Sequence, residues 1–494
     1  MSGVNTQTCD VIVIGAGPVG ENVADRTAAA GLDTIIVESE LVGGECSYWA
    51  CQPSKALLRP ALLYGEAVRF PGVGATVTGP LDTRAVLEHR NRMASDWNDH
   101  SQVEWVGTAG ISLLRGHGRL DGVRQVTVLT PDGDTVRLQA RHAVAICTGT
   151  RAALPPLPGL DALRPWTSRE ATSASEVPGR LAIVGAGVVA TEMATAWRAL
   201  GSQVTLIARG THLLDRMEPF AADLVADRLR AAGVDLRFGR TIATAERAGG
   251  PDDSIRLTLD DGARIVADEL LFATGRAPRT ADIGLDTVGL DPGAWLATDD
   301  TYTVTSVDGE WLYAAGDVNH RALLTHQGKY QARIAGAVIA DRACGRTLET
   351  GPFGRHSGTA DLVAVPQVVF TDPEVAAVGL TAAEAARQGR AVDIVDYDLG
   401  RVAGAVQFDP DYRGRARVLV DPERRVLVGA TFAGPGVAEL LHSATIAITG
   451  EVPIDRLWHA VPSYPTISEI WLRLLETYRD QQDSQVQATG DSAS

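Results

Sequence analysis

Residues 10–20 of this chain read DVIVIGAGPVG, and this stretch decides the fold. Its first five residues form a mainly apolar, β-branched run of the kind that builds a buried parallel strand. Gly15, Gly17 and Gly20 then stand in the spacing G-x-G-x-x-G, and a helical pattern follows over residues 21–30. Such glycines allow the backbone to approach a pyrophosphate at the N-terminus of a helix. The stretch therefore predicts a dinucleotide-binding strand–turn–helix unit.

A second strand and an acidic residue complete this fingerprint. Residues 34–37 (TIIV) are β-branched or apolar, and Glu38 follows them. A carboxylate at this position accepts hydrogen bonds from a ribose diol. A glycine-rich turn without a ligand is the alternative, but the strands, glycines and acid together are typical of a nucleotide site.

The same fingerprint recurs in the middle of the chain. Residues 181–184 (LAIV) predict a strand, and Gly185, Gly187 and Ala190 form the variant G-x-G-x-x-A. A helical pattern follows over residues 191–199. Two such units indicate two nucleotides, for instance FAD and a nicotinamide dinucleotide.

The second unit differs from the first at the end of its second strand. Arg209 stands there, and no acid is present. A carboxylate would repel a 2′-phosphate, whereas a guanidinium can pair with it. We therefore expect NADPH rather than NADH, and a solvent-exposed Arg209 without a ligand is the alternative.

Three further strand-like runs each lead into a short pair of residues: Thr148-Gly149, Thr274-Gly275 and Gly316-Asp317. An aspartate that follows a strand and a glycine can meet the hydroxyl groups of an extended cofactor, or it can cap a helix. We expect the first and third pairs to contact the nucleotide of the first unit, and Gly275 to contact the nucleotide of the second.

The composition is that of a globular protein, with 45% hydrophobic and 21% charged residues. The net charge of −16 argues against a nucleic-acid partner. No apolar run reaches the roughly 18–20 residues that a membrane-spanning helix needs, and residues 1–9 lack the pattern of a signal peptide. We expect a cytoplasmic protein without a membrane partner.

Cys46 and Cys51 lie close together in residues 43–55, which read GGECSYWACQPSK. The pair could form a structural disulfide, half a metal site or a redox dithiol. Five cysteines in 494 residues argue against a secreted disulfide framework. Zinc sites usually show a second Cys or His pair at short spacing, and the sequence has none. We therefore expect a redox dithiol and no metal, with inert thiols or a metal site as alternatives.

Together these segments resemble the class I pyridine nucleotide-disulfide oxidoreductases, the family of lipoamide dehydrogenase, glutathione reductase and mercuric reductase. The resemblance extends over roughly residues 8–480 and includes AGDV at 315–318 and VFTDPE at 369–374. It implies an α/β fold with two Rossmann-like domains that bind FAD and NAD(P)H, a C-terminal α+β dimerisation domain, and a homodimer. The expected domains are 1–152 and 281–345 (FAD binding), 153–280 (NAD(P) binding) and 361–480 (dimerisation), with 481–494 as a disordered tail.

The resemblance also implies roles for individual residues. Cys51 would be the thiolate beside the flavin, and Cys46 the interchange thiol that meets the substrate. Lys55 would lie near the flavin and pair with Glu192; two solvated charges on separate helices are the alternative. Hydride would pass from the nicotinamide to FAD, and electrons would pass on to the Cys46–Cys51 disulfide. The helix that follows Cys51 would lower its thiol pKa.

The C-terminal motif departs from the family pattern. A His-Pro-Thr segment followed by a glutamate is usual, and its histidine serves as acid–base across the dimer. Here residues 463–469 read SYPTISE, so Tyr464 replaces the histidine while Glu469 remains. A phenol with a pKa of about 10 is a poor general base at pH 7. His459 is out of register with the motif. Mercuric reductases also lack the histidine, but they carry a C-terminal cysteine pair that is absent here.

We therefore expect an FAD-dependent NAD(P)H oxidoreductase that acts on a small dithiol or disulfide, as dihydrolipoyl dehydrogenase does. A quinone or metal-ion reductase on the same scaffold is the alternative for the small-molecule partner. A non-catalytic nucleotide sensor is a third interpretation, and the intact Cys46, Cys51, Lys55 and Glu192 argue against it.

Overall fold

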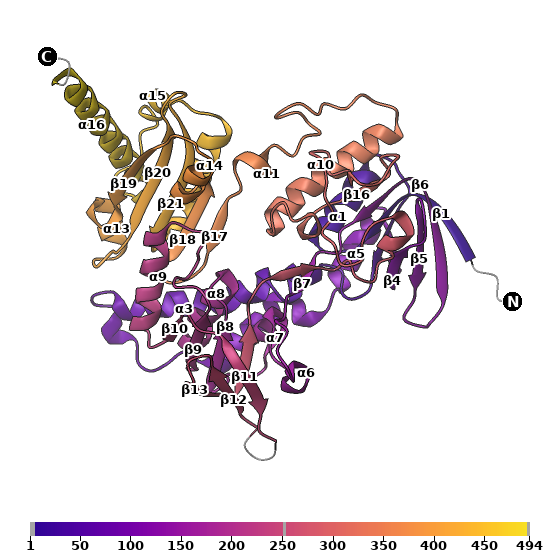
Figure 1. The fold of residues 1–494 in the computed structure, drawn as a ribbon, viewed down its shortest axis with the longest axis horizontal. Helices are drawn as coiled ribbons and strands as arrows, with labels where there is room; N and C mark the ends of the chain where they lie inside the picture. Colours follow the sequence, from indigo (N-terminus) through magenta and orange to yellow (C-terminus); the bar gives the residue numbers. More distant parts are fainter. Residues whose placement is uncertain (1–4, 250–252, 492–494) are drawn as a thin grey trace.

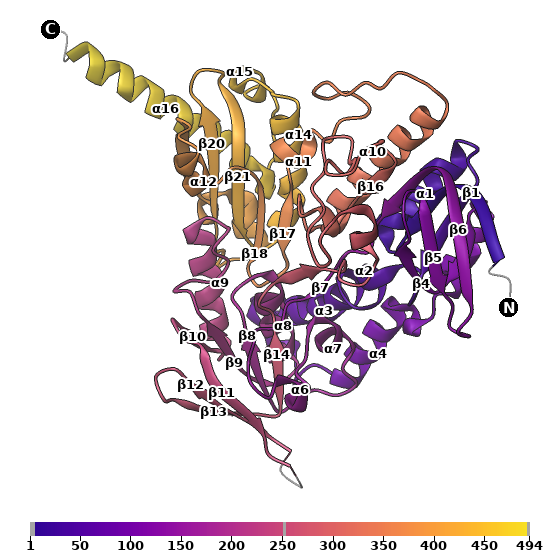
Figure 2. The same ribbon diagram turned by 45° about the vertical axis from the view of Figure 1, so that its right-hand side comes forward.

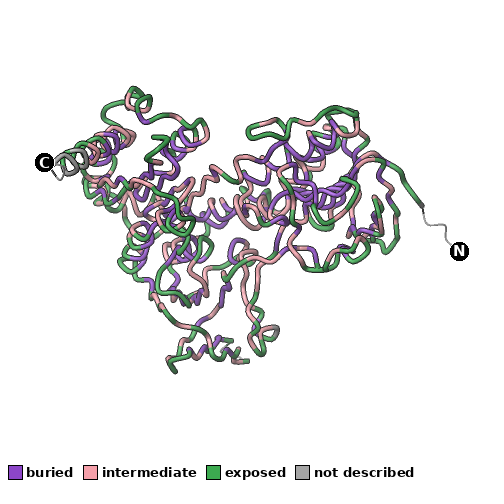
Figure 3. The backbone as a smooth tube through the Cα atoms, turned by 45° about the horizontal axis from the view of Figure 1, so that its top comes forward, coloured by how far each residue is buried: buried purple, intermediate pink, exposed green. Residues whose placement is uncertain are grey.

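The computed structural model describes residues 5–249 and 253–491, which form three modules, each built on its own main β-sheet (Figure 1). The turned view in Figure 2 shows the first module at the right, the second below the centre and the third at the upper left. Figure 3 shows that buried backbone is concentrated within the modules, while exposed backbone follows their loops. The α/β fold class predicted from the sequence is confirmed.

The first module contains a seven-stranded sheet of order β3-β2-β1-β6-β5-β4, with β16 beside β6. Its strands are β1 (Asn5–Ile14), β2 (Thr34–Glu38), β3 (Ser112–Arg115), β4 (His117–Leu120), β5 (Gln125–Leu129), β6 (Thr135–Ile146) and β16 (Leu312–Ala314). Its helices are α1 (Pro18–Ala29), α2 (Gly44–Tyr48), α3 (Cys51–Arg69), α4 (Thr83–Met93), α5 (His100–Thr108) and α10 (Thr325–Ala343). β1 pairs in parallel with β2 and β6, and β16 pairs in parallel with β6. The carboxyl ends of these strands therefore meet at one edge of the sheet.

Alternation along β1 explains how this sheet is covered. Val11 and Val13 pack in a cluster with side chains of α1 and α10. Ile12 and Ile14 point to the other face and pack with side chains of β4, β5 and β6. Successive side chains of a strand point to opposite faces, so the buried part of β1, residues 11–14, anchors both layers.

The second module contains a parallel four-stranded sheet of order β10-β9-β8-β14. Its strands are β8 (Arg180–Val184), β9 (Gln203–Ala208), β10 (Asp235–Phe238) and β14 (Glu269–Phe272), with an antiparallel extension of β11 (Ile242–Arg247), β12 (Ile255–Leu259) and β13 (Arg264–Ala267). Its helices are α6 (Leu160–Leu163), α7 (Ser168–Ser173), α8 (Val188–Ala199) and α9 (Pro219–Ala231). β7 (Thr150–Ala152) and β15 (Arg276–Pro278) form a two-stranded antiparallel link with the first module.

The first position of each fingerprint requires glycine for the same structural reason. Gly15 has φ +99°, and a Cβ there would lie 2.6 Å from the Cys147 carbonyl oxygen. Gly185 has φ +138°, and a Cβ would lie 2.3 Å from the Ala273 carbonyl oxygen. In both modules the turn passes so close to the end of a neighbouring strand that only glycine fits. The two modules therefore repeat one another in detail.

The third module contains an antiparallel five-stranded sheet of order β17-β18-β21-β20-β19. Its strands are β17 (Gln367–Val369), β18 (Glu374–Gly379), β19 (Asp393–Asp398), β20 (Arg415–Asp421) and β21 (Val426–Gly434). Its helices are α11 (Ala360–Val363), α12 (Ala382–Arg387), α13 (Ala403–Phe408), α14 (Leu441–Thr449), α15 (Ile454–Leu457) and α16 (Ile470–Asp491).

Short 3₁₀ turns across the chain are η1 (Gly74–Thr76), η2 (Ser95–Trp97), η3 (Leu285–Val288), η4 (Asp317–Asn319), η5 (Leu399–Arg401), η6 (Val437–Leu440) and η7 (Ile467–Glu469).

The chain end differs from the expectation of a disordered tail over 481–494. α16 continues through Asp491 and projects away from the third module (Figures 1 and 2). Extending a helix that has already formed costs far less than starting one, and the tail contains no proline. Residues 492–494 lie outside the described residues.

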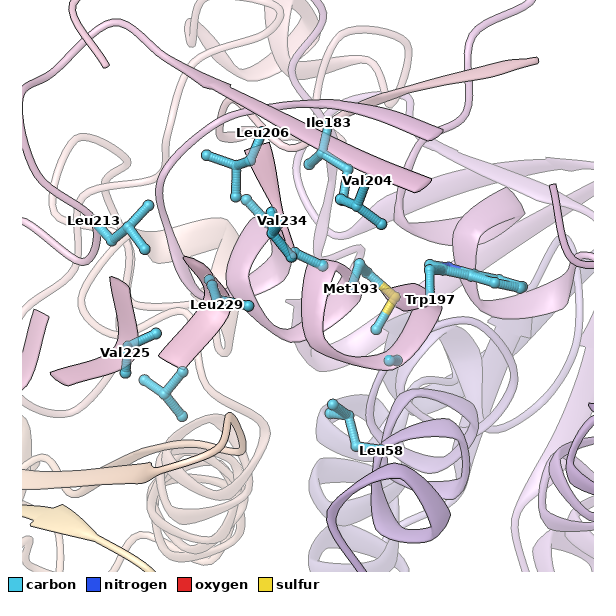
Figure 4. Close-up of a cluster of buried hydrophobic side chains, with 14 of the residues drawn as sticks. Leu58, Ile183, Met193, Trp197, Val204, Leu206, Leu213, Val225, Leu229 and Val234 are labelled. Atoms are coloured by element: carbon cyan, nitrogen blue, oxygen red, sulfur yellow. The ribbon is translucent and has the colours of Figure 1, made fainter. Parts of the chain in front are cut away.

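One hydrophobic cluster joins the three modules. Leu58 of α3 lies beneath Met193 and Trp197 of α8 (Figure 4). Val369 of β17 and Val375 of β18 belong to the same cluster. The modules therefore share a core, and this core fixes α3 and α8 relative to each other. In the described residues, no helix is both long enough and apolar enough to cross a membrane.

Candidate active site

A cavity of about 2380 Å³ runs between the first two modules and reaches the third. Most of the site residues expected from the sequence line it: Gly15, Gly17, Glu38, Cys46, Cys51, Lys55, Thr148, Gly149, Gly185, Gly187, Glu192, Arg209, Gly275, Gly316 and Asp317. They come from distant parts of the chain because the carboxyl ends of parallel strands open on the same crevice.

Gly20 and Ala190 do not line this cavity. A Cβ on Gly20 would lie 1.8 Å from the Gly15 carbonyl oxygen, and Ala190 is completely buried at the start of α8. Both positions keep the helix close to its strand, which is the role of the last glycine or alanine in the fingerprint. Their part in nucleotide binding is therefore to shape the turn.

The first half of the cavity fits FAD. Glu38 is held in place by the Ala16 amide, which donates to its Oε2 at 2.7 Å. Thr148 Oγ1 is buried without a hydrogen-bond partner, although it belongs to a residue that lines the cavity. A buried polar atom of this kind calls for a partner. Asp317 accepts a hydrogen bond from Thr150 at 2.7 Å, and burial raises its pKa. Glu38, Thr148 and Asp317 thus offer polar groups along the length of an extended dinucleotide.

The two cysteines sit on consecutive short elements at the centre of the cavity. Cys46 belongs to α2, and Cys51 is the first residue of α3. Both are free thiols and half-buried. The Thr325 side chain, at the start of α10, lies 3.3 Å from each sulfur. Two helix N-termini, those of α3 and α10, thus converge on the sulfur pair.

The residues between the cysteines are held by the surrounding structure. Tyr48 is completely buried, and its hydroxyl donates to the Val42 carbonyl at 2.9 Å. Trp49 packs against the guanidinium of Arg169, and its carbonyl accepts a hydrogen bond from Thr172 at 2.9 Å. These contacts hold the bulky Tyr48-Trp49 pair in place between the two cysteines.

The two thiols differ in acidity. The hydrogen bond with Cys46 has the largest effect on Cys51, and the Thr325 hydroxyl and the Lys55 ammonium act in the same direction; against burial they lower the pKa of Cys51 to about 6. The hydrogen bond with Cys51 and burial raise the pKa of Cys46. Since the thiolate is the reactive form, Cys51 carries the charge near neutral pH.

Lys55 and Glu192 form an ion pair of 2.8 Å between Nζ and Oε2. Glu192 is almost fully buried on α8, and its Oε1 accepts the Phe370 amide at 3.0 Å. The Lys55 ammonium also lies 4.9 Å from the centre of the Phe370 ring. The three modules therefore meet at one charged contact beside Cys51.

An arginine cluster lies next to the cysteines and was not anticipated from the sequence. Glu45, which directly precedes Cys46, pairs with Arg169 at 2.9 Å, Arg276 at 2.5 Å and Arg279 at 3.1 Å. Burial disfavours its ionisation, but Arg276 and Arg169 outweigh burial and lower the pKa of Glu45. Arg276 directly follows the Thr-Gly strand end, which was the only sequence signal for it.

At the second nucleotide site, Arg209 is exposed at the end of β9 and makes no ion pair with a described residue. His212 and Arg216 in the following loop also line the cavity. The sequence drew attention only to Arg209, because the loop has no fixed spacing that would mark the other two. The guanidinium groups here are free to meet an anionic ligand.

The structure does not bring Tyr464 or Glu469 into the cavity of their own chain. Tyr464 is 76% exposed on the third module. Glu469 is buried and pairs with Arg473 at 2.7 Å, and its second oxygen has no partner. His459, on the exposed surface, lines no part of the cavity either.

In the described residues, no group of three or more His, Cys, Asp or Glu side chains is arranged to hold a metal ion. The side-chain groups around the cysteine pair are the Thr325 hydroxyl and the ion pair of the Lys55 ammonium with the Glu192 carboxylate.

Known family models and related proteins match this chain over most of its length. Residues 9–337 match the family model described as pyridine nucleotide-disulphide oxidoreductase, and residues 365–474 match the dimerisation domain of the same enzymes. The chain is 32% identical to mercuric reductase of Shigella flexneri over 93% of this chain and 79% of that protein. It is 28% identical to dihydrolipoyl dehydrogenase of Chlamydia muridarum over 94% of this chain and 95% of that protein.

Solved structures show the same fold. The HOCl-induced flavoprotein disulfide reductase RclA from Escherichia coli, in a Cu(II) complex, has a TM-score of 0.80 at 22% identity and covers 95% of this chain and 99% of its own. LpdA from Mycobacterium tuberculosis has a TM-score of 0.79 at 23% identity and covers 94% of this chain and 99% of its own.

Proposed function

The chain belongs to the pyridine nucleotide-disulphide oxidoreductase family, and from this premise we propose that it uses Cys46 and Cys51 to exchange electrons with a small disulfide or dithiol. It is an FAD-dependent oxidoreductase that uses NAD(P)H. When bound, FAD takes up two electrons from a reduced nicotinamide and can deliver them to a disulfide. The specific substrate and the roles of the individual residues are our proposal.

The observation that carries the proposal is the placement of the sulfur pair at the N-termini of α3 and α10, beside the Lys55–Glu192 ion pair. Cys51 lies at the N-terminus of α3, and the Lys55 ammonium contributes to its low pKa. A thiol of low pKa is a good leaving group in thiol–disulfide exchange. Cys46 has the raised pKa, which suits a sulfur that meets the substrate after it is deprotonated. The pair therefore supports dithiol chemistry of the dihydrolipoyl dehydrogenase kind.

A second candidate is reduction of a metal ion or quinone. Mercuric reductase of Shigella flexneri is among the relatives, and Tyr464 stands in the motif where dithiol enzymes carry a histidine. A soft metal ion binds thiolates without needing a general base. This observation keeps a metal-ion acceptor open beside the disulfide.

The decisive experiment compares Cys46→Ser with the wild-type enzyme, using NADPH oxidation with a disulfide panel, a quinone and a soft metal ion. Our proposal predicts loss of disulfide reduction in Cys46→Ser, with Cys344→Ser, an exposed cysteine outside the cavity, as the matched control. Retained quinone reduction in Cys46→Ser would support the second candidate, in which the flavin reduces the acceptor directly. Retained disulfide reduction would contradict the proposal.

We also propose that the enzyme is a homodimer. The dimerisation domain carries large exposed apolar side chains, among them Ile446 at 57%, Val461 at 85% and Tyr464 at 76%. Exposed apolar surface of this kind is typical of an interface. In a dimer, Tyr464 and Glu469 of one chain would serve the cysteine pair of the other.

The same proposal includes the domain boundaries expected from the sequence, the preference for NADPH and a cytoplasmic location. The three sheets and the position of Arg209 support the first two. The low cysteine content supports a reducing compartment.

A further inference from the structure

Thr325 has so far been only a hydrogen-bond partner that lowers the pKa of Cys51, yet its hydroxyl contacts both cysteines. Its Oγ1 lies 3.3 Å from Cys46 Sγ and 3.3 Å from Cys51 Sγ. In the described part of the chain, no other side chain apart from the cysteines themselves hydrogen-bonds either sulfur. The hydroxyl therefore bridges the redox pair.

The hydroxyl is held firmly in this position. Thr325 is the first residue of α10, a helix of 19 residues. Gln327 and Gln331 of the same helix donate to the two oxygens of Asp361 at 2.6 Å and 3.0 Å. Gln331 also accepts the Gly316 amide at 2.8 Å. Buried hydrogen bonds of this kind fix the N-terminal turn of α10, and with it the bridge.

A single hydroxyl proton has two sulfur partners. The Thr325 hydroxyl donates to Cys46 Sγ, whereas between the hydroxyl and Cys51 Sγ either atom can be the donor. When Cys46 is the thiolate, the hydroxyl donates to Cys46 and accepts from the Cys51 thiol. When Cys51 is the thiolate, the hydroxyl can donate to Cys51 instead.

We propose that Thr325 is a catalytic residue that relays a proton between Cys51 and Cys46 in the reduced enzyme. In the forward direction the Cys46 thiol gives its proton to Thr325 Oγ1, while the Thr325 hydroxyl proton moves to the Cys51 thiolate. One S–H and one O–H bond break, one O–H and one S–H bond form, and the net charge is unchanged. The result is a Cys46 thiolate that can attack the substrate and a Cys51 thiol.

The relay answers a specific need of this chain. Near neutral pH the negative charge rests on Cys51, whereas the attack on an outside disulfide needs the thiolate on Cys46. Tyr464, which occupies the histidine position of the motif, is a poor general base at that pH. A relay inside the subunit moves the charge without a base from another chain.

The charged groups around the sulfurs agree with this assignment. Lys55 on α3 is the cation facing Cys51, and it is held by Glu192 on α8. Glu45 on α2 forms ion pairs with three arginines. His326, next to Thr325, directs its Nε2 to the Pro366 carbonyl at 2.9 Å. None of these side chains hydrogen-bonds a cysteine sulfur in the described structure. Apart from the direct hydrogen bond between the two cysteines, the Thr325 hydroxyl is therefore the side-chain group placed to pass the proton.

The test uses Thr325→Val, which keeps the shape, and Thr325→Ser, which keeps the hydroxyl. In the reduced protein, alkylation of each cysteine by iodoacetamide is followed by peptide mass spectrometry across the titration range of the thiols. We expect Thr325→Val to slow Cys46 alkylation at neutral pH by about tenfold, because a hydrogen bond to a charged group is lost. Thr325→Ser should restore most of the rate.

A second readout distinguishes a relay from simple packing. The reaction of the reduced protein with Ellman's reagent is measured in mixtures of H₂O and D₂O. A relay moves two protons, so the wild-type rate should depend on the deuterium fraction along a curve, and Thr325→Val should give a straight line. Thr195→Val is the matched control, because the Thr195 hydroxyl is half-buried and bonds only the Thr191 carbonyl of its own helix.

The relay would be overturned if Thr325→Val kept the wild-type alkylation profile and the curved isotope dependence. It would also be overturned if Thr325→Ser failed to restore the alkylation rate and the curvature that Thr325→Val loses. The inference rests on the proposed function of Cys46 and Cys51, but it fails separately. The proposed function fails if Cys46→Ser still reduces disulfides with NADPH. The relay is judged from alkylation and isotope dependence, which need no turnover.

Discussion

Lys55 Nζ lies 2.8 Å from Glu192 Oε2, and this ion pair connects the helix that begins at Cys51 with the second nucleotide-binding module. The Glu192 side chain is 4% exposed and that of Lys55 is 39% exposed. The second carboxylate oxygen accepts the Phe370 amide of the third module. The pair thus fixes a positive charge near the redox thiolate and aligns three modules around it.

Removing the charge of Lys55 should make Cys51 less acidic. In Lys55→Met the attraction between ammonium and thiolate is lost, so we expect the alkylation curve of Cys51 to move to higher pH by roughly one unit. Iodoacetamide alkylation of the reduced protein measures this shift. Arg69→Met is the matched control, because it removes the Arg69–Asp372 pair of 2.8 Å, which also joins modules but contacts neither cysteine. An equal shift in both variants would mean that the effect comes from module alignment.

The acidity of Cys51 should also appear in the pH dependence of stability. Folding lowers the pKa of Cys51 from 9.0 to about 6, so the unfolded chain binds more protons between these two values. The free energy of unfolding of the reduced protein should therefore gain from this group as pH rises from 6 to 9, and lose that gain as pH falls. The raised pKa of Cys46 acts in the opposite direction only above pH 9.

Urea unfolding of the reduced protein at several pH values, compared with Cys51→Ser, measures this contribution. The oxidised protein is the control, because a disulfide has no thiol to titrate. A slope between pH 6 and pH 9 that is the same in wild type and Cys51→Ser would contradict the assignment of the low pKa to Cys51.

Arg209 should set the choice of nicotinamide nucleotide. In Arg209→Glu a carboxylate replaces the guanidinium that we expect beside the 2′-phosphate. A charge-assisted contact is then lost and a repulsion is added, so kcat/KM for NADPH should fall by about 100-fold. The value for NADH should stay within about threefold, which provides the internal control. Steady-state kinetics with both nucleotides check the expectation. A parallel loss for NADH would instead indicate damage to the whole site.

Glu218 should hold the second module to the third. It is buried at the start of α9, accepts Arg417 Nη1 at 2.8 Å and accepts the Ala382 amide at 2.7 Å. Glu218→Ala removes the acceptor of the Ala382 amide and of Arg417 Nη1, while Asp396 still binds the Arg417 guanidinium at 2.8 Å. We therefore expect a loss of about 2 kcal/mol in the free energy of unfolding. Chemical denaturation measures it. Glu88→Ala, which removes an exposed pair on α4, should change stability by less than about 0.5 kcal/mol. Equal effects of the two variants would count against a structural role of Glu218.

Much of the site could be anticipated from short-range patterns. The spacing of Gly15, Gly17 and Gly185 and the close pair Cys46 and Cys51 reflect local geometry, and such geometry is written in consecutive residues. The bridge from Thr325 could not be anticipated, because 279 residues separate it from Cys46 and only the packing of α10 brings it there. The same holds for Phe370, whose amide contacts Glu192 across 178 residues.

The sequence by itself determined the two nucleotide-binding units, the redox character of the cysteine pair and the family, because each depends on residue types at fixed short spacing. Tertiary structure decided which groups surround the sulfurs. It buried Tyr48, paired Glu45 with three arginines, and placed one hydroxyl between two thiols. These contacts join segments that are distant in the chain, and their energies depend on burial and distance, which no local pattern specifies.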